Sequence, residues 1–213
     1  MIKCILFDMD GTIADTTPLC IEAFRASIEP YLGRAIDDME LIRTFGPSEE
    51  GTIMAFIPDH FEEGVSLYLD IYQKLHNECP APFAGIPELL RRLRGAGYFL
   101  GLITGKGIKS LSISLKKFAL ADAFDALYTG SIEGACKEKS MIAALLEHNF
   151  SPEEVVYIGD TVYDITASRS AGISVFAAAW AKTVDLHALQ LACPDKILYS
   201  VDELSAIFLT DRC

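Results

Sequence analysis

Two aspartates, Asp8 and Asp10, directly follow an apolar run in the segment ILFDMDGTIADTT (residues 5–17). Gly11 comes next and lets the chain turn sharply, so both carboxylates are expected where a strand ends. Such a pair can share a metal ion, or divide the roles of nucleophile and acid/base. The alternative is that the two aspartates only shape a turn, because short acidic side chains favour turns.

A second acidic pair has the same form. The segment YIGDTVYD (157–164) is an apolar run and a glycine, followed by Asp160 and Asp164. Four carboxylates at the same end of two strands would repel one another strongly unless a cation held them together. A divalent ion that prefers oxygen ligands resolves this conflict, and we expect Mg²⁺.

A third apolar run ends in groups that could bind an anion. Thr104 follows this run in LITGKG (102–107), where a helix is expected to begin near Gly107. A hydroxyl beside the free N–H groups of a helix N-terminus would suit a phosphate. Simple turn chemistry is the alternative for a threonine and glycine at a strand end.

Two lysines, Lys137 and Lys139, lie in GACKEKSMI (134–142), ahead of the run that ends at Asp160. A lysine in a loop is usually solvated, so its position in the fold decides whether it reaches the acidic pairs. Either ammonium could reach back as a point charge for phosphate.

The elements expected to hold these residues alternate between strand and helix. Apolar runs of strand length lie at 1–7, 98–104, 155–160 and 173–180, with weaker candidates at 124–130 and 196–200. Helical patterns separate them, at 86–97, 107–120, 139–149 and 164–172. Such alternation predicts an α/β fold with a parallel sheet covered on both faces. In such sheets, ligands bind beyond the carboxyl ends of the strands, where the catalytic residues are also expected.

Residues 17–80 interrupt this alternation, because they contain no convincing strand. Four helical patterns fill the stretch, at 18–32, 37–45, 48–57 and 60–78. The stretch closes at CPAPFAG (79–85), whose two prolines look like a linker. We therefore expect two domains, an α/β core of residues 1–14 and 83–213 and a helical cap of residues 15–82.

The composition limits the class of protein. The 213 residues are 51% hydrophobic and 23% charged, which suits a folded chain with a sizeable core. A formal charge of −12 disfavours binding to nucleic acid or to an anionic membrane. The N-terminus has no long apolar stretch, which predicts a cytoplasmic protein without a signal peptide or membrane span. Reduced thiols rather than a zinc site or disulfides are expected of six cysteines without a C-x-x-C pair, namely Cys4, Cys20, Cys79, Cys136, Cys193 and Cys213.

The chain resembles the haloacid dehalogenase superfamily, and within it the phosphoglycolate-phosphatase-like hydrolases with a helical cap after the first strand. FDMDGT, LITGK, a lysine ahead of a helix and GDTVYD match the family's four motifs in order, over nearly the whole chain. The first and fourth motifs, taken together, are a highly specific indication of this family, whereas the second and third are loosely defined sequence patterns. The resemblance implies a Rossmann-like core with an inserted all-helical cap. It also implies an Mg²⁺-dependent phosphatase for small phosphate monoesters of the phosphoglycolate or sugar-phosphate type.

The resemblance implies a role for each aspartate. Asp8 would be the nucleophile that forms an aspartyl-phosphate, and Asp10 the acid/base that protonates the leaving alcohol and then activates water. Mg²⁺ would be held by the Asp8 carboxylate, the Asp10 backbone carbonyl and Asp160. Asp164 would orient bound water or contribute from farther out.

The resemblance also implies a phosphate site. Thr104 and a lysine would bind the phosphoryl oxygens, assisted by backbone N–H groups around Gly11 and Gly105. The family's third motif often reads Lys-Pro, whereas CKEK has no proline. The 23-residue interval from Lys137 to Asp160 matches relatives without that proline, which favours Lys137 and leaves Lys139 open.

Several other functions compete with the phosphatase. A phosphosugar mutase of the beta-phosphoglucomutase type shares all four motifs, and a non-catalytic phosphate-binding regulatory module could keep the pocket. A dehalogenase would not need Asp10, and phosphonate cleavage would need a Schiff-base lysine in the cap, where Lys74 is the only lysine. The expected partner is a small phosphorylated metabolite, bound by a monomer or homodimer. Arg43 in RTFGPSEEG (43–51) is the candidate cation for a second anionic group, unless that stretch only turns the chain and Ser48 caps the next helix.

Overall fold

A six-stranded sheet forms the centre of the protein in a computed structural model that describes residues 1–209. Every neighbouring pair of strands is parallel, and the order across the sheet is β3-β2-β1-β4-β5-β6. The first strand of the chain therefore lies inside the sheet, between β2 and β4. The strands are β1 (Cys4–Phe7), β2 (Phe99–Ile103), β3 (Ala126–Tyr128), β4 (Val155–Gly159), β5 (Ser174–Ala178) and β6 (Lys196–Leu198).

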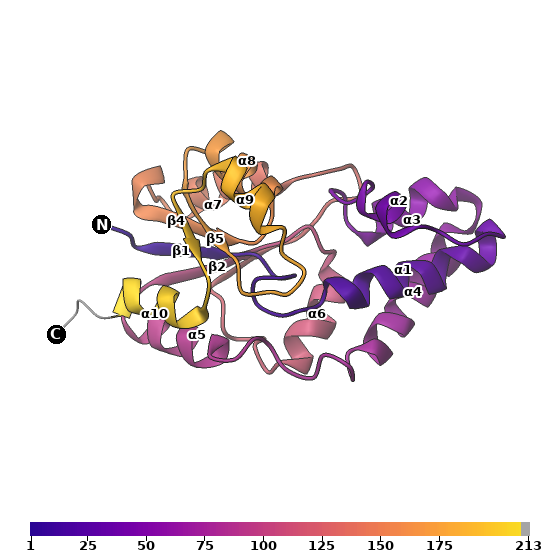
Figure 1. Cartoon of the computed structure of the whole chain (residues 1–213), viewed down its shortest axis with the longest axis horizontal. Helices are drawn as coiled ribbons and strands as arrows, with labels where there is room; N and C mark the ends of the chain where they lie inside the picture. The colour runs from indigo at the N-terminus through magenta and orange to yellow at the C-terminus, as the bar shows by residue number, and fades with distance from the viewer. Residues whose placement is uncertain (210–213) are drawn as a thin grey trace.

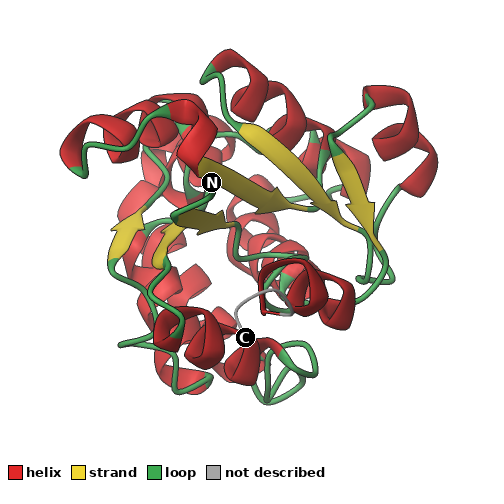
Figure 2. Ribbon diagram, turned by 90° about the vertical axis from the view of Figure 1, so that its left-hand side faces the viewer, coloured by secondary structure: helices red, strands yellow, loops and turns green. Residues whose placement is uncertain are grey.

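Helices cover both faces of this sheet (Figures 1 and 2). Ile5 and Phe7 of β1 pack in one buried cluster, and the alternate residues Cys4 and Leu6 pack in another, as the two-residue period of a strand requires. The first cluster includes residues of α5 (Ile86–Gly95), α6 (Ile108–Lys117) and α10 (Val201–Leu209). The second includes residues of α7 (Lys137–Glu147), α8 (Val162–Ser170) and α9 (Leu186–Ala192). A short 3₁₀ turn, η2 (Pro152–Glu154), precedes β4.

Four α-helices and a short 3₁₀ helix follow β1 and form a cap at one end of the molecule (Figure 1). Aromatic rings join its two long helices, since the centroids of Phe24 and Tyr68 lie 4.6 Å apart. Gly33 ends the first long helix in the left-handed conformation, with φ +73°. The cap comprises α1 (Thr17–Leu32), α2 (Asp38–Ile42), α3 (Glu49–Phe56), η1 (Pro58–His60) and α4 (Phe61–Leu75).

The predicted fold class is confirmed, since a parallel sheet with helices on both faces carries an all-helical insertion after β1. Helices α9 and α10 were not predicted from the sequence. A signal for α10 was present, because Ser200 and Glu203 have the spacing of a capping box, and the Ser200 hydroxyl accepts the Glu203 N–H at 3.2 Å. We retain the domain limits at residues 14/15 and 82/83 as a proposal.

The described part of the chain has two further properties that bear on the sequence predictions. Within residues 1–209, no helix is both long enough and apolar enough to cross a membrane. The five cysteines in this range are free thiols. The sixth, Cys213, lies outside the described residues.

Candidate active site

Three polar side chains that the sequence singled out follow three adjacent strands. Phe7, the last residue of β1, lies level with Leu102 of β2 and Ile158 of β4. Asp8, Thr104 and Asp160 therefore emerge at the same edge, beyond the carboxyl ends of their strands. The Asp8 N–H donates to the Ile158 carbonyl at 2.8 Å, which ties the start of the loop to β4. The sheet brings the first, second and fourth motifs together.

Gly11 is required by the loop that follows Asp10. Its φ is +80°, in the left-handed region, and a Cβ atom there would lie 2.0 Å from Asp160 Oδ2. The next residue, Thr12, donates its hydroxyl to Asp160 Oδ1 at 3.5 Å. The Trp180 indole N–H donates to the Thr12 carbonyl at 3.1 Å, which anchors this loop. Gly11 therefore allows the loop of the first motif to lie directly against Asp160 of the fourth motif.

Replacing Gly11 by Ala tests this close approach, with Gly33→Ala as its matched control. Both glycines have φ between +70° and +80°, but nothing lies within 4 Å of a Cβ at Gly33. Each variant should lose about 1–2 kcal/mol of unfolding free energy from the left-handed backbone. Gly11→Ala should lose at least about 1 kcal/mol more, since it crowds Asp160. Turnover should fall at least about tenfold in that variant only. Urea unfolding and steady-state rates measure both effects, and equal results for the two variants would contradict the close approach.

Lys137 is the lysine that the fold brings to the aspartates. Its Nζ lies 2.8 Å from Asp8 Oδ2 and 2.6 Å from Asp164 Oδ1, and its side chain is 8% exposed. The Tyr157 ring lies beneath it, with Nζ 5.9 Å from the ring centroid. Lys139 is exposed. The start of α7 therefore directs the first of the two lysines into the site and the second into solvent.

Asp164 holds this lysine in place and also begins α8. Its Oδ2 accepts the Thr161 N–H at 3.0 Å and the Thr161 hydroxyl at 2.6 Å, while the Thr161 hydroxyl accepts the Asp164 N–H at 3.2 Å. This reciprocal capping box is typical of helix starts. Both carboxylate oxygens of Asp164 are thus engaged, one by Thr161 and the other by Lys137.

The acidic cluster is electrostatically strained. Burial raises the pKa of Asp8 to about 7, with Lys137 lowering it and the charges of Asp164 and Asp10 raising it. Burial, together with the charge of Asp8, also raises the pKa of Asp160 well above its ordinary value. One ammonium does not balance these carboxylates, so the site favours a further cation.

A hard divalent cation fits this cluster. Asp8, Asp160 and Asp164 each offer a carboxylate oxygen, and the three oxygens lie within 4.8 Å of one another. Carboxylate oxygens are the ligands that Mg²⁺ prefers. Asp8 and Asp160 would be the side chains that hold it, since the oxygens of Asp164 already serve Lys137 and Thr161.

Asp10 lies beside the cap rather than in the acidic cluster. Its Oδ1 accepts the Thr16 hydroxyl at 2.5 Å and forms an ion pair with Lys106 Nζ at 3.3 Å. The Cys20 thiol also donates to Oδ1, at 3.7 Å. None of these three neighbours was predicted from the sequence, although Lys106 stands in the LITGK motif two residues after Thr104.

Thr104 and Gly105 begin the loop that joins β2 to α6. The Thr104 N–H donates to the Tyr128 carbonyl at 3.0 Å, and its hydroxyl accepts the Lys106 N–H at 3.2 Å. Thr104 is buried and Gly105 is partly exposed. Glu49 of the cap meets the same loop, since its Oε2 accepts the Gly107 N–H at 2.7 Å. This carboxylate lies at the positive end of the α6 dipole.

The cap loop at residues 43–48 meets the core beside this point. The Ser48 N–H donates to the Ser131 carbonyl at 2.8 Å. Ser48 is the N-cap residue of α3, but its side chain makes no capping hydrogen bond. Arg43, the cation suggested for a second anionic group, is exposed, so that role stays a prediction.

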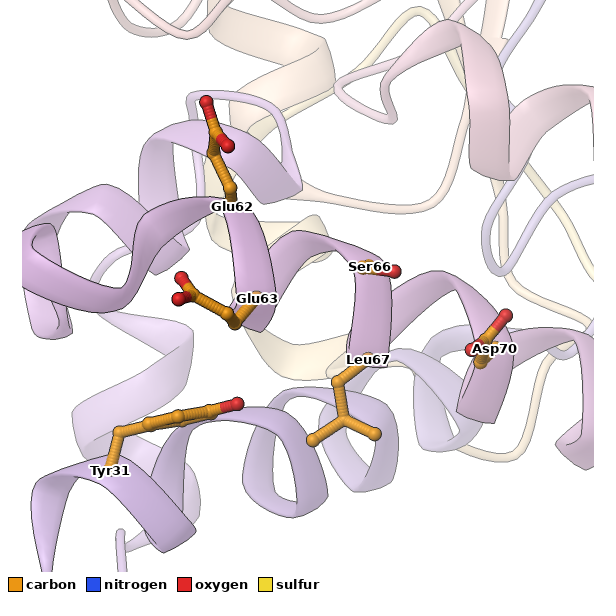
Figure 3. Close-up of a pocket in the computed structure, with 6 residues that line it drawn as sticks. All are labelled: Tyr31, Glu62, Glu63, Ser66, Leu67 and Asp70. Carbon is orange, nitrogen blue, oxygen red and sulfur yellow. The ribbon is translucent and has the colours of Figure 1, made fainter.

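A separate hollow lies on the cap, and none of its lining residues belongs to the site at the strand edge (Figure 3). It has a volume of about 510 Å³ and lies between α1 and α4, where acidic side chains are prominent. A phosphate would be repelled there, so the strand edge is the better candidate site. Its lining residues are Tyr31, Glu62, Glu63, Ser66, Leu67 and Asp70.

Comparison with known proteins decides the family. Residues 5–178 match the haloacid dehalogenase-like hydrolase family, which is more than three quarters of the chain. The chain belongs to this family. Its enzyme class, a hydrolase, is thereby confirmed, and the matched range contains the residues of all four motifs.

Similar proteins agree with this assignment to the haloacid dehalogenase-like hydrolases. The pyrophosphatase PpaX of Listeria innocua is 31% identical over 210 residues, covering 97% of this chain and 96% of its own. A haloacid dehalogenase-like hydrolase, SP0104 from Streptococcus pneumoniae, is 30% identical with a TM-score of 0.77, covering 97% and 98% of the two chains. A structure described as a predicted phosphatase from Clostridium acetobutylicum is 25% identical with a TM-score of 0.79, covering 99% of each chain.

Proposed function

We propose that this hydrolase is an Mg²⁺-dependent phosphatase that acts on small phosphate compounds through an aspartyl-phosphate on Asp8. The observation that carries the proposal is the contact of Lys137 with Asp8 at 2.8 Å, beside Asp160 and at the end of β1. A nucleophilic carboxylate, a fixed cation and oxygen ligands for a metal are the groups that phosphoryl transfer needs. The phosphatase names of similar proteins support the same conclusion.

Each residue has a separate task in this mechanism. Asp8 attacks phosphorus, and Lys137 binds the phosphoryl oxygens together with the Thr104 hydroxyl and the N–H groups near Gly11 and Gly105. Asp10 protonates the leaving group and then takes a proton from the water that hydrolyses the aspartyl-phosphate. The metal, when bound by Asp8, Asp160 and the Asp10 carbonyl, supplies positive charge against the anionic phosphate.

The substrate class has two candidates. Small phosphate monoesters of the phosphoglycolate or sugar-phosphate type are the first, and a small phosphorylated metabolite is the expected partner. Inorganic pyrophosphate is the second, favoured by the name of the Listeria innocua relative. A phosphosugar mutase would differ in the acceptor of the phosphoryl group, which would be a sugar hydroxyl instead of water.

A substrate panel with Mg²⁺ tests the proposed function. We expect phosphate release from at least one of pyrophosphate, phosphoglycolate and a set of sugar phosphates. Excess chelator should abolish that release, because the carboxylates then lack their counter-charge. Isomer formation, followed in the same reactions, would instead identify a mutase. Equal rates in chelator, or no reaction with any compound, would contradict the proposal.

Binding of Mg²⁺ without substrate gives a second prediction. At about 100 times the dissociation constant, the ion should raise the free energy of unfolding by about 2.7 kcal/mol. Asp160→Asn should remove most of this gain, because it removes a ligand from the cluster. Thermal unfolding of both proteins with and without Mg²⁺ measures it. If Mg²⁺ stabilised wild type and Asp160→Asn equally, the ion would bind at a site that does not include Asp160.

Some sequence predictions about the protein's setting remain proposals. The charge of −12 continues to argue against nucleic acid and anionic membranes as partners. We retain the cytoplasm as the proposed location and a monomer or homodimer as the proposed form.

A further inference from the structure

Lys106 is a buried cation that the proposed chemistry does not yet use. It belongs to the loop after β2, and its side chain is only 2% exposed. Its Nζ lies 3.3 Å from Asp10 Oδ1 and 3.1 Å from Cys20 Sγ, and 4.4 Å from the centroid of the Tyr72 ring. Burying an ammonium this fully is costly unless it is paired, so the position of Lys106 calls for a partner.

Asp10 is the charged partner of Lys106. Its carboxylate supplies the opposite charge at 3.3 Å, which offsets the cost of burying the ammonium. Cys20 lies between these two charged groups. The thiol donates to Asp10 and accepts from Lys106, and so acts as a neutral link.

The contacts to Asp10 all meet one of its two oxygens. Thr16, Cys20 and Lys106 converge on Oδ1. Among residues 1–209, no side-chain hydrogen bond is made to the other oxygen, Oδ2. The Asp10 side chain is 24% exposed, in contrast to the buried lysine. One oxygen is therefore fixed and the other is available.

We propose that Lys106 is the positioning residue for Asp10, whose Oδ1 it holds so that Oδ2 faces the leaving group of the substrate. The cap supplies Thr16, Cys20 and Tyr72, and the core supplies Lys106, so the acid/base is oriented only where cap and core meet. Lys137 and Lys106 then have different tasks, since the first contacts the nucleophile and the second contacts the acid/base. This inference rests on the proposed function.

Leaving groups of different basicity separate this role from a structural one. An alkyl phosphate needs a proton on its leaving oxygen, whereas 4-nitrophenyl phosphate needs little help, because nitrophenolate is a weak base. The value of kcat/KM reports the steps up to and including the first loss of the leaving group. A poorly oriented Asp10 therefore lowers kcat/KM for the alkyl ester selectively.

The test compares Lys106→Met with wild type on glycerol 3-phosphate and 4-nitrophenyl phosphate. The methionine keeps an apolar stem beside Tyr72 and removes the charge. We expect kcat/KM to fall at least about 100-fold for the alkyl ester and less than about fivefold for the nitrophenyl ester. Lys109→Met, at an exposed lysine in α6, the helix that follows this loop, should change neither value. If Lys106→Met does not fold, Lys106→Gln carries the same expectation.

A double variant shows whether Lys106 acts through Asp10. In an Asp10→Asn background, adding Lys106→Met should cause no further loss on the alkyl ester, since the residue that it orients is already disabled. Equal losses on the two esters, or a full additional loss in the double variant, would overturn the inference and leave the proposed phosphatase intact. A wild-type enzyme that hydrolyses neither ester nor any other phosphate compound would overturn both.

Discussion

Asp8→Asn is expected to lower turnover at least about 10⁴-fold, as removal of a catalytic nucleophile does in other enzymes. The amide keeps the size and shape of the side chain but cannot attack phosphorus at a useful rate. The variant should remain folded, because burial already disfavours the charged form of Asp8, and Lys137 keeps its contact with Asp164 at 2.6 Å. The loss can therefore be assigned to chemistry rather than to unfolding.

Steady-state rates and thermal unfolding, measured on the same preparations, check this result. Asp70→Asn is the matched control, since Asp70 is an exposed aspartate of the cap, at the hollow in Figure 3. It should leave the rate unchanged. A rate near that of wild type in Asp8→Asn would show that another group attacks phosphorus.

Lys137→Met is the second change with a large expected effect. It leaves the buried carboxylates of Asp8 and Asp164 without their shared ammonium, and breaking a buried ion pair in this way costs about 3–5 kcal/mol. Turnover should also fall steeply, because the phosphoryl oxygens lose their fixed cation. Mg²⁺ should recover part of the stability, since it returns positive charge to the same cluster.

Lys139→Met is its matched control, two residues further along α7 and exposed. Its free energy of unfolding should change by less than about 0.5 kcal/mol, as is usual for surface positions. Urea unfolding and steady-state rates at a temperature where both variants are folded give the comparison. A severe loss at Lys139 with little change at Lys137 would reverse the assignment of the third motif.

The strand edge could be predicted from sequence because its signals are local. Each apolar run stops at a polar residue, and in a parallel sheet these stops meet at one edge, so Asp8, Thr104 and Asp160 could be placed together before the fold was known. Gly11 was recognised as a turn residue. Its close approach to Asp160 was not, since that contact spans most of the chain.

The surroundings of Asp10 could not be predicted in the same way. They depend on how the cap lies against the core, which brings Cys20 to Lys106 across 86 residues of sequence. Glu49 also meets Gly107 only through this packing. Neither the hydrophobic periodicity of the sequence nor the spacing of its motifs encodes such contacts between cap and core. Lys106 stands three residues after the end of β2, but only Thr104 and Gly105 of this loop were considered as candidates from the sequence.

The missed helices have a different cause. Helix α9 is seven residues long, which is too short for its apolar spacing to stand out. For the third motif, by contrast, the sequence selected the correct residue. Lys137 and Lys139 are two lysines of the same segment, and the 23-residue interval from Lys137 to Asp160 favoured Lys137, which lies against Asp8. The family's third motif supplied the reference that made this interval informative.

Direct detection of the phosphorylated residue tests the central claim, that Asp8 attacks phosphorus. The enzyme is mixed with its best substrate from the panel and Mg²⁺, quenched in acid within one turnover, digested and examined by peptide mass spectrometry. We predict one phosphoryl group on the peptide that contains Asp8, and none in the Asp8→Asn variant. Turnover with no phosphoryl group on that peptide at any quench time, or with the group on another residue, would contradict the account.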